Sequence, residues 1–216
     1  MSTDTIVTMA TPPTTAKPPP RTRAARGEGE RLRHDLLDAA AELMAVHGDI
    51  DAISLRAVAR RVGVSATAVY RHFDDHVDLL RESVEHCWSN FLHVLAEAAT
   101  TSSDPFVAFR AMGDAYVRFA LDRPGQYRVL FSSKVALGDG DAPGGLAAFQ
   151  LLLDMVARML RANGDDRDPF FVAVQVHTWM HGIVDLCGSH PDMPWPDTDA
   201  LLDGLASSLR LEPTTT

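Results

Sequence analysis

The stretch SLRAVARRVGVSATAVYRHF, residues 54–73, decides the fold because it predicts two short helices joined by a tight turn. Ser54 can cap the first helix, since its hydroxyl can accept a hydrogen bond from an unpaired backbone N–H. Gly63 ends that helix because glycine readily takes the left-handed conformation of a C-terminal turn. Ser65 is a second N-cap, and the second helix is expected over residues 66–73. This is the pattern of a helix-turn-helix, whose second helix enters the major groove of DNA.

The side chains of the second helix suit contact with DNA. Residues 65–68 are small, so the start of the helix can approach a duplex closely and its backbone N–H groups can bind phosphate. Tyr70, Arg71 and His72 add a phenol, a guanidinium and an imidazole at the far end. Arg56 is one of three arginines that make the preceding helix basic. An ordinary helical hairpin with a solvated basic face has the same spacing, so these residues alone leave both interpretations open.

A longer run, GDIDAISLRAVARRVGVSATAVYRHFDDHVDLL over residues 48–80, resembles the DNA-binding region of TetR-family transcriptional regulators. The resemblance rests on the Leu-Arg-x-Val-Ala pattern, the Gly-Val-Ser turn, the Tyr-Arg-His-Phe sequence and the two leucines at the end. It implies an all-α homodimer, with an N-terminal three-helix helix-turn-helix domain and a larger C-terminal helical domain for ligand binding and dimerisation. It also implies that Tyr70 and His72 touch phosphate, and that Thr67 and Ala68 lie near base edges.

One position departs from the family pattern. The family usually has lysine where this chain has His76, and that lysine contacts the DNA backbone. His76 can still donate to phosphate, but its charge depends on pH, and Asp74 and Asp75 beside it repel phosphate. The predicted DNA contacts are Arg56, Ser65, Ala66, Thr67, Ala68, Tyr70, Arg71, His72 and His76.

Charge is divided unevenly along the chain, whose net charge is −9. Residues 17–73 hold ten Lys and Arg against seven Asp and Glu, whereas residues 74–216 hold ten against twenty-one. An acidic C-terminal part would repel DNA and confine contact to one end, although such a surface is equally ordinary in a soluble protein. We expect a disordered basic tail at 1–27, a DNA-binding domain at 28–74, and a ligand-sensing and dimerisation domain at 75–216.

The tail is rich in Thr, Pro, Ala and Arg and has no periodicity, which predicts disorder. Arg21, Arg23 and Arg26 lie at its end, just before the first predicted helix. They could follow the DNA backbone or enter the minor groove. A solvated linker that happens to be basic explains them equally well.

Composition argues against several other classes of protein. The two cysteines, Cys87 and Cys187, have neither metal-ligand spacing nor the pattern of a disulfide framework, so a reducing cytosol is the simplest context. No apolar run reaches the roughly 18 residues of a membrane span, and the first residues lack the features of a secretory signal. We find no nucleophile with a positioned base, no phosphate loop and no paired-carboxylate motif. The expectation is therefore a cytoplasmic protein that is not an enzyme and needs no cofactor.

Helical spacing of apolar residues predicts the rest of the chain. The first helix is expected at 28–47, with an apolar stripe that ends at Val46. Asp74 or Asp75 should cap a long helix at 75–99 that links the two domains. Residues 132–145, rich in Gly and Pro, predict a mobile loop. Further helices are predicted at 104–121, 124–131, 146–162, 169–187 and 198–210.

Apolar and aromatic residues of the second domain are candidates for a ligand pocket. Each of them is also an ordinary core residue, and methionine fills cores as readily as it adapts to ligands. Few charged residues accompany them, which suggests an apolar or aromatic ligand. The candidates are Trp88, Phe91, Met112, Tyr116, Phe119, Met155, Met159 and Trp179.

Two further segments resemble a subgroup of the TetR family: RPGQYRVLF at 123–131, and HTWMHGIVDL at 177–186 with its Trp-x-His-Gly signature. The resemblance places both in the sensing domain. It implies that helices 146–162 and 169–187 pair with their symmetry mates in a four-helix dimer interface. His177 and His181 lie four residues apart, but no third ligand accompanies them, so we expect no metal there.

These expectations combine into one function. The protein is predicted to be a homodimeric repressor that binds a palindromic operator as double-stranded DNA and is released by a small-molecule effector. A DNA-binding architectural protein without a ligand, or an activator, are the alternatives that the sequence leaves open.

Overall fold

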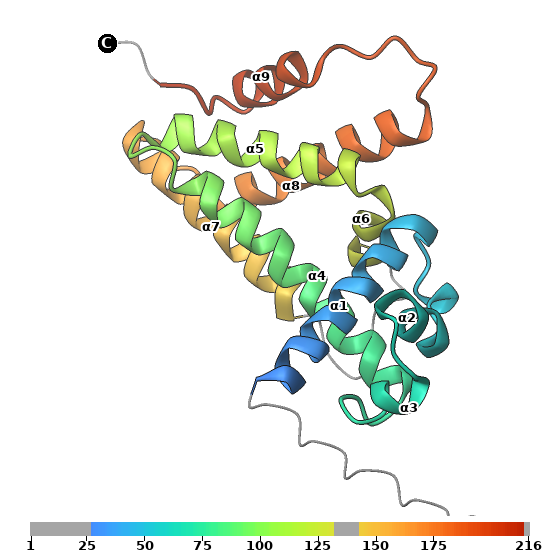
Figure 1. Cartoon of the computed structure of the whole chain (residues 1–216). Coiled ribbons are helices and arrows are strands. Elements are labelled where there is room, and N and C mark those ends of the chain that lie inside the picture. The colour runs from blue at the N-terminus through green and yellow to red at the C-terminus, as the bar shows by residue number, and fades with distance from the viewer. Residues whose placement is uncertain (1–26, 132–142, 214–216) are drawn as a thin grey trace, which may run out of the picture.

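Helices and turns make up the described residues, 27–131 and 143–213, in a computed structural model (Figure 1). That part of the chain contains no strand, as the all-α prediction requires. The predicted tail and most of the predicted loop at 132–145 lie outside the described residues. The elements are α1 Glu28–His47, the 3-10 turn η1 Ile50–Ala52, α2 Leu55–Val62, α3 Ala66–Val69, α4 His76–Ala99, α5 Pro105–Asp122, α6 Pro124–Phe131, α7 Pro143–Ala162, α8 Pro169–Ser189 and α9 Thr198–Ser208.

The helix-turn-helix forms with the predicted caps. The Ser54 hydroxyl accepts from the backbone N–H of Ala57, and the Ser65 hydroxyl accepts from that of Ala68, both at 3.2 Å. Gly63 closes α2 with a φ of 80°, in the left-handed region. These caps fix the directions in which the two short helices leave the turn.

The second helix is shorter than predicted. It ends at Val69, and the chain then continues in tight turns to Phe73, whose backbone N–H still bonds to the Val69 carbonyl at 3.2 Å. Helices often end in such tightened turns. Here both ends of the turn are held in the core, because the Val69 and Phe73 side chains are buried.

Helix α1 packs across α2 and α4 through a buried stripe that includes Leu36, Ala40 and Met44. The predicted stripe included Val46, which is wrong: Val46 is 73% exposed. The buried stripe advances by four residues at a time. Leu43 therefore lies at its margin, and Val46, three residues further on, falls outside it.

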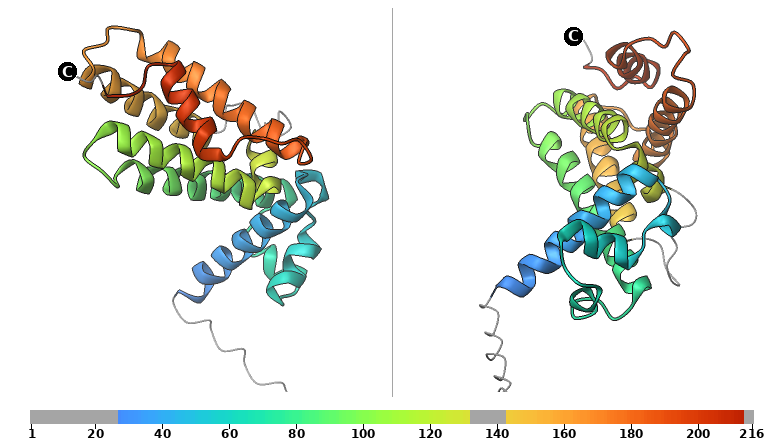
Figure 2. Two further views of the ribbon diagram at one scale, coloured as in Figure 1. Left: turned by 90° about the horizontal axis from the view of Figure 1, so that it is seen from above. Right: turned by 45° about the vertical axis from the view of Figure 1, so that its right-hand side comes forward.

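Helix α4 belongs to both halves of the molecule (Figures 1 and 2). Its first turns pack on α1, and its remainder packs on α5 and α7. We call α1–α3 with residues 70–75 the N-terminal unit, and α5–α9 with the rest of α4 the body. The C-terminal α9 lies along α5 on the far side of the body from α1–α3 (Figure 1), where Arg110 pairs with Asp199 at 2.7 Å and with Asp203 at 3.2 Å.

Most helix boundaries in the body agree with the sequence. Asp75, Asp104 and Asp168 cap α4, α5 and α8 with their side chains. Helix α7 begins three residues before the predicted 146, and α9 ends at Ser208, two residues before the predicted end. No described helix is both long enough and apolar enough to cross a lipid bilayer.

Helix α6 joins the body to the N-terminal unit. A Cβ on Gly125 would lie 2.2 Å from the carbonyl oxygen of Ala45 and 2.4 Å from that of Met44, so the backbone of α6 sits directly on the end of α1. The next residue, Gln126, is buried and donates from Nε2 to the Ala41 carbonyl at 2.9 Å. Only glycine allows so close a helix–helix approach.

Gly125→Ala is therefore expected to destabilise the protein by about 1–3 kcal/mol, as overpacking of a tight contact does. Urea unfolding followed by circular dichroism measures the change. The matched control is Gly204→Ala in α9, where a Cβ meets nothing within 4 Å and the better helix propensity should be neutral or stabilising by up to about 1 kcal/mol. Equal stability of Gly125→Ala and the wild type would contradict the close contact.

Candidate DNA-binding surface and ligand cavity

Helix α3 and the turn after it present an exposed polar surface. Thr67, Arg71 and Tyr70 are exposed, and the Tyr70 side chain is 58% exposed, which is unusual for a large aromatic residue. The predicted small residues Ala66 and Ala68 are half-buried, while Ser65 and Arg56 are exposed. Val69 anchors this surface from beneath because it is fully buried.

Positive charge on this surface is only partly neutralised. Arg61 pairs with Glu42 at 2.6 Å. Among the described residues, Arg56, Arg60 and Arg71 make no ion pair with a carboxylate. Three unpaired guanidinium groups on the helix-turn-helix favour an anionic polymer as partner.

His72 differs from its neighbours because its ring is half-buried beside α1. Burial lowers the pKa of His72, and the Arg71 and Arg33 guanidinium groups lower it further. Its imidazole is therefore neutral at physiological pH. A neutral imidazole has one N–H, so His72 can donate a single hydrogen bond to a phosphate.

His76, at the first position of α4, is already engaged. Its Nε2 lies 2.6 Å from the carbonyl oxygen of Ile53. A carbonyl can only accept, so Nε2 carries the hydrogen, and Nδ1 of a neutral ring then has only a lone pair. Neutral His76 therefore cannot donate to a DNA phosphate while this bond exists. The lysine that the family usually has at this position would carry three donors.

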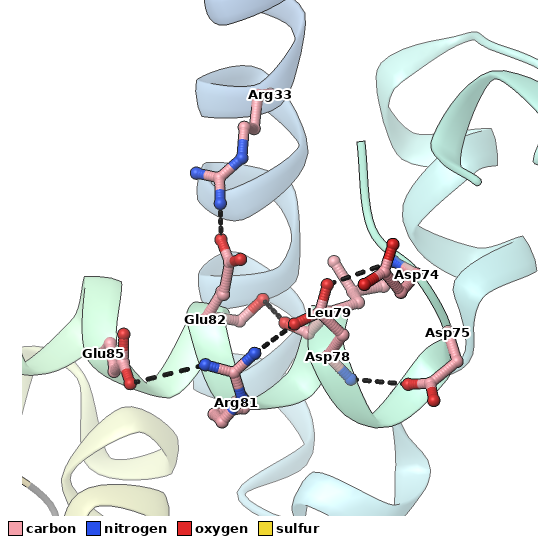
Figure 3. A network of polar contacts seen from close by, with 9 residues as sticks. Arg33, Asp74, Asp75, Asp78, Leu79, Arg81, Glu82 and Glu85 are labelled. Atoms are coloured by element: carbon pink, nitrogen blue, oxygen red, sulfur yellow. Dashed lines mark hydrogen bonds and ion pairs between the residues drawn. The ribbon is translucent and has the colours of Figure 1, made fainter. Parts of the chain in front are cut away.

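Carboxylates occupy the start of α4 (Figure 3). Asp75 accepts from the backbone N–H of Asp78 at 2.8 Å, and Asp78 accepts from that of Asp74 at 3.1 Å. Arg81 pairs with Asp78, and one turn further along α4, Glu82 pairs with Arg33 of the neighbouring α1. The helix N-terminus that could otherwise hold a phosphate is capped by the protein's own acidic groups.

A small cavity lies inside the body. Its volume is about 60 Å³, and its walls come from α4, α5, α6, α7, α8 and α9. Of the predicted pocket residues, Phe91, Met112 and Tyr116 line it. The sequence missed Phe131 and Phe149, which also line it. Phe131 ends the RPGQYRVLF stretch, which was assigned to the sensing domain but not to its pocket.

Five predicted pocket residues do not line the cavity. Trp88 is buried against Phe131, with ring centroids 5.1 Å apart. Phe119, Met155 and Met159 are buried in the core, as the alternative interpretation of these residues expected. Trp179 is 39% exposed and lines a separate hollow of about 300 Å³ together with Trp195 and Leu201. Helical spacing identified residues that face the interior of the body, but it could not tell packed positions from those beside a gap.

Polar groups at the cavity wall are few and largely paired. Arg110 is bonded to Asp114 at 2.9 Å as well as to the two aspartates of α9. The Tyr116 hydroxyl lies 3.0 Å from that of Tyr127, which in turn lies 2.6 Å from Nδ1 of His181. Burial raises the pKa of both tyrosines, so these phenols stay protonated at physiological pH.

A second hollow, of about 420 Å³, lies between the end of α1 and the body. Gly48 and Ile50 form one side, and Tyr127 and His181 are among the residues of the other. Phe131 lines both this hollow and the inner cavity. Its ring therefore separates the inside of the body from the junction with the N-terminal unit.

Two family models match the chain, one over the helix-turn-helix region and one over the body. Residues 36–82 match "Bacterial regulatory proteins, tetR family", and residues 109–209 match "Tetracyclin repressor-like, C-terminal domain". The chain belongs to the TetR family. It is a transcriptional regulator whose two parts match the DNA-binding domain and the C-terminal domain of this family.

Solved structures share the fold over most of their length. A protein of unknown function from Rhodococcus sp. RHA1 is 26% identical, with a TM-score of 0.72, over 87% of this chain and 96% of that one. A TetR family transcription regulator from Marinobacter aquaeolei VT8 is 17% identical, with a TM-score of 0.63 over 84% and 95% of the two chains. FadR from Bacillus subtilis, solved in complex with stearoyl-CoA, is 14% identical, with a TM-score of 0.66 over 82% and 96%.

The predicted Trp-x-His-Gly subgroup of the TetR family stays a prediction. The motif lies on α8, where His181 faces Tyr127 and Trp179 faces outward. His177 lines the cavity, with its ring centroid 4.4 Å from that of His181. His181 is therefore held by its hydrogen bond with Tyr127, and His177 by its ring contact with His181.

Helix α8 of this TetR-family body exposes a broad apolar surface. Its exposed large residues are Phe170, Phe171, Val174, Trp179 and Leu186. On α7 the exposed positions are more polar, with Gln150, Asp154 and Arg158 following the exposed Leu146. The exposed apolar surface is thus concentrated on α8, although the family resemblance places both helices in a dimer interface.

The half-buried imidazole of His181 predicts a pH dependence of stability. Burial and the neighbouring His177 lower its pKa to about 4, against about 6.5 in an unfolded chain. Between these values the unfolded state binds a proton that the folded state does not, so stability falls as pH falls through this window. For a half-buried group we expect a loss of roughly 2–3 kcal/mol.

Urea unfolding at pH 7.5 and pH 4.5 measures this loss. His181→Gln should reduce the difference between the two pH values but not abolish it, because burial also lowers the pKa of His177. His93→Gln is the control, since the His93 side chain is 70% exposed. An unchanged pH difference in His181→Gln would show that the shift is absent.

Proposed function

We propose that this TetR-family protein is a homodimeric repressor that binds a palindromic operator and leaves it when a small apolar or aromatic molecule enters the body. The observation that carries the DNA part is the exposure of Thr67 on α3 and of Tyr70 and Arg71 in the turn after it, while Arg56 and Arg60 on α2 are exposed as well. Thr67 and Ala68 would lie over base edges, and Ser65, Ala66 and the phenol and guanidinium groups would contact the backbone.

In this proposal His72 donates one hydrogen bond to phosphate, and neutral His76 makes no phosphate contact. The bond from His76 to the Ile53 carbonyl supports the second point, since it uses the only N–H of the neutral ring. The remaining backbone affinity then rests on the arginines and Tyr70. Arg21, Arg23 and Arg26 could add to it from the tail.

The exposed aromatic residues of α8 support the proposed dimer. Phe170, Phe171 and Trp179 on one helix leave apolar area in water that a second copy would bury. Pairing of α7 and α8 with their symmetry mates would form the four-helix interface, with α8 contributing most of its apolar part. A two-fold dimer presents two N-terminal units, as an inverted repeat in DNA requires.

The nature of the cavity supports an apolar effector. Among the described residues, Arg110 is the cation at its wall, and its pairing with three carboxylates leaves it no free charge for an anionic ligand. The volume of about 60 Å³ holds only a few water-sized groups. A larger molecule must push helices apart, and α4 is one of the walls. We infer that entry of the ligand would move α4 and with it the N-terminal unit.

A DNA-binding architectural protein or an activator remain the competing functions. An architectural protein would bind DNA with the same affinity whether or not the cavity is filled. An activator would bind the same operator but raise transcription. The sequence and the fold favour repression over activation only because the chain belongs to this family. Transcription from a reporter gene, measured with and without the protein, distinguishes repression from activation.

DNA affinity tests the proposed surface. Arg56→Ala should weaken binding to any duplex and reduce the slope of log affinity against log salt by about 0.9, as loss of one phosphate contact does. Tyr70→Phe should weaken binding about tenfold or more, because a hydrogen bond to a charged group contributes roughly 1.5–3 kcal/mol, and should leave that slope unchanged. Fluorescence anisotropy with a labelled duplex at several salt concentrations measures both quantities.

The control for these variants is Arg118→Ala, which removes an exposed arginine from α5 in the body. It should change neither the affinity nor the slope. Equal effects of Arg118→Ala and Arg56→Ala would mean that net charge, rather than the surface of α3, sets the affinity.

Binding of a neutral apolar dye tests the cavity. N-phenyl-1-naphthylamine should bind the wild type with enhanced fluorescence and weaken its affinity for DNA. Ala148→Leu, which places a larger side chain in the cavity wall, should abolish dye binding. Gln150→Leu on the exposed side of the same helix is the matched control and should bind the dye normally. Equal dye binding by the two variants would place the ligand site elsewhere.

A further inference from the structure

Two imidazoles and a carboxylate meet where α1 crosses α4. His34 and Asp38 lie one turn apart on α1, with His34 Nδ1 3.0 Å from Asp38 Oδ2. His86 comes from α4, 48 residues further along the chain than Asp38, and its Nε2 lies 2.8 Å from Asp38 Oδ1. One potential ligand atom from each of the three residues lies within 4.8 Å of the others. In the part of the chain that the structure describes, this is the one group of three such side chains.

The contacts of His86 decide how the neighbouring Asn90 amide is oriented. Its Nε2 lies 2.8 Å from a carboxylate oxygen, which needs a donor, and 3.2 Å from Asn90 Nδ2, which is itself a donor. One nitrogen cannot donate to Asp38 and accept from Asn90 at the same time. A half-turn of the Asn90 amide removes the conflict, since the two orientations are equivalent in shape and the amide oxygen then faces Nε2. That oxygen lies next to the side chains of His86 and Asp38, where it is available as a further ligand atom.

The donor set matches a borderline transition metal. Imidazole nitrogen and carboxylate oxygen bind Zn²⁺ at about 2.0–2.2 Å, and three protein ligands plus a water make an open tetrahedral site. Mg²⁺ and Ca²⁺ prefer oxygen ligands and would gain little from two imidazoles. The adjacent Cys87 does not contribute, because its side chain is fully buried in the core, with Sγ 4.0 Å from Met44 Sδ. The side chains of His34 and Asp38 are 66% and 49% exposed, so both can adjust around an ion.

We propose that His34, Asp38 and His86 bind a divalent transition-metal ion of the Zn²⁺ class, with water or the Asn90 amide in the fourth position. The ion would tie α1 to α4 next to the pairing of Arg33 with Glu82 (Figure 3). It would therefore stabilise the folded protein in proportion to its occupancy. The site does not depend on DNA binding or on a ligand in the body.

Isothermal titration of the full chain with ZnCl₂ tests the site. The wild type should bind one ion per chain at this position. His34→Gln and Asp38→Asn should each weaken that binding at least as much as loss of an outer-shell partner does, roughly 10- to 100-fold. The control is His93→Gln. His93 pairs with Glu97 at 3.3 Å on the same face of α4 but has no third ligand, so its loss should not change the affinity.

Two further readouts separate the site from a simple hydrogen-bonded cluster. Co²⁺ should produce the visible absorption of a tetrahedral site with nitrogen and oxygen ligands in the wild type, and His86→Gln should remove it. Zn²⁺ should raise the melting temperature of the wild type and of His93→Gln but not that of His34→Gln, whose exposed side chain makes misfolding an inadequate explanation. No ion uptake by the folded wild type, or equal uptake by His34→Gln and His93→Gln, would overturn the proposal.

Discussion

The contact of α6 with the end of α1 is the constraint on which the rest of the structure depends. Gly125 brings the α6 backbone against the carbonyl groups of Met44 and Ala45, and Gln126 bonds to the carbonyl of Ala41. Helix α4 is the other connection between the two halves. A single connecting helix would leave the N-terminal unit free to pivot on the body. The second, non-covalent connection fixes the angle. The N-terminal unit is thereby held in one orientation on the body.

The same short helix reaches the interior of the body. Tyr127 bonds to Tyr116 and His181, and Phe131 lines both the inner cavity and the hollow beside α1. Helices α6 and α4 are thus two of the walls that a molecule entering the cavity can displace. We infer that α4 and the contact of α6 with α1 would shift together when a ligand enters. A ligand that binds one arrangement of the helices more tightly than another would then change the spacing of the two DNA-binding surfaces in a dimer.

The sequence predicted the architecture well because its caps and apolar spacing act locally. Ser54, Ser65 and Asp75 cap the helices that they were expected to cap. The early end of α3 and the exposure of Val46 were missed, since both depend on how α1 and α4 pack over the helix-turn-helix. Such tertiary contacts override local spacing.

Site residues were predicted less completely, for a similar reason. Exposed positions on α3 follow from the helix-turn-helix pattern, which fixes their face. The engagement of His76 with Ile53 joins positions 23 residues apart, and no local pattern contains it. The cavity is a gap between six helices, so only its location in the body could be expected. The RPGQYRVLF stretch was identified from the sequence only by its resemblance to a TetR subgroup. The structure shows why it contains Gly125: the backbone of α6 lies against the end of α1.

The most direct test of the central claim is selection of bound fragments from a random pool of double-stranded DNA by the purified protein. If the body fixes two DNA-binding surfaces in one dimer, the enriched fragments should share an inverted repeat. The centres of its half-sites should lie about one helical turn apart, roughly 34–36 Å, or a multiple of that distance. Enrichment of a single unrepeated half-site, or retention of DNA without sequence preference, would contradict the account.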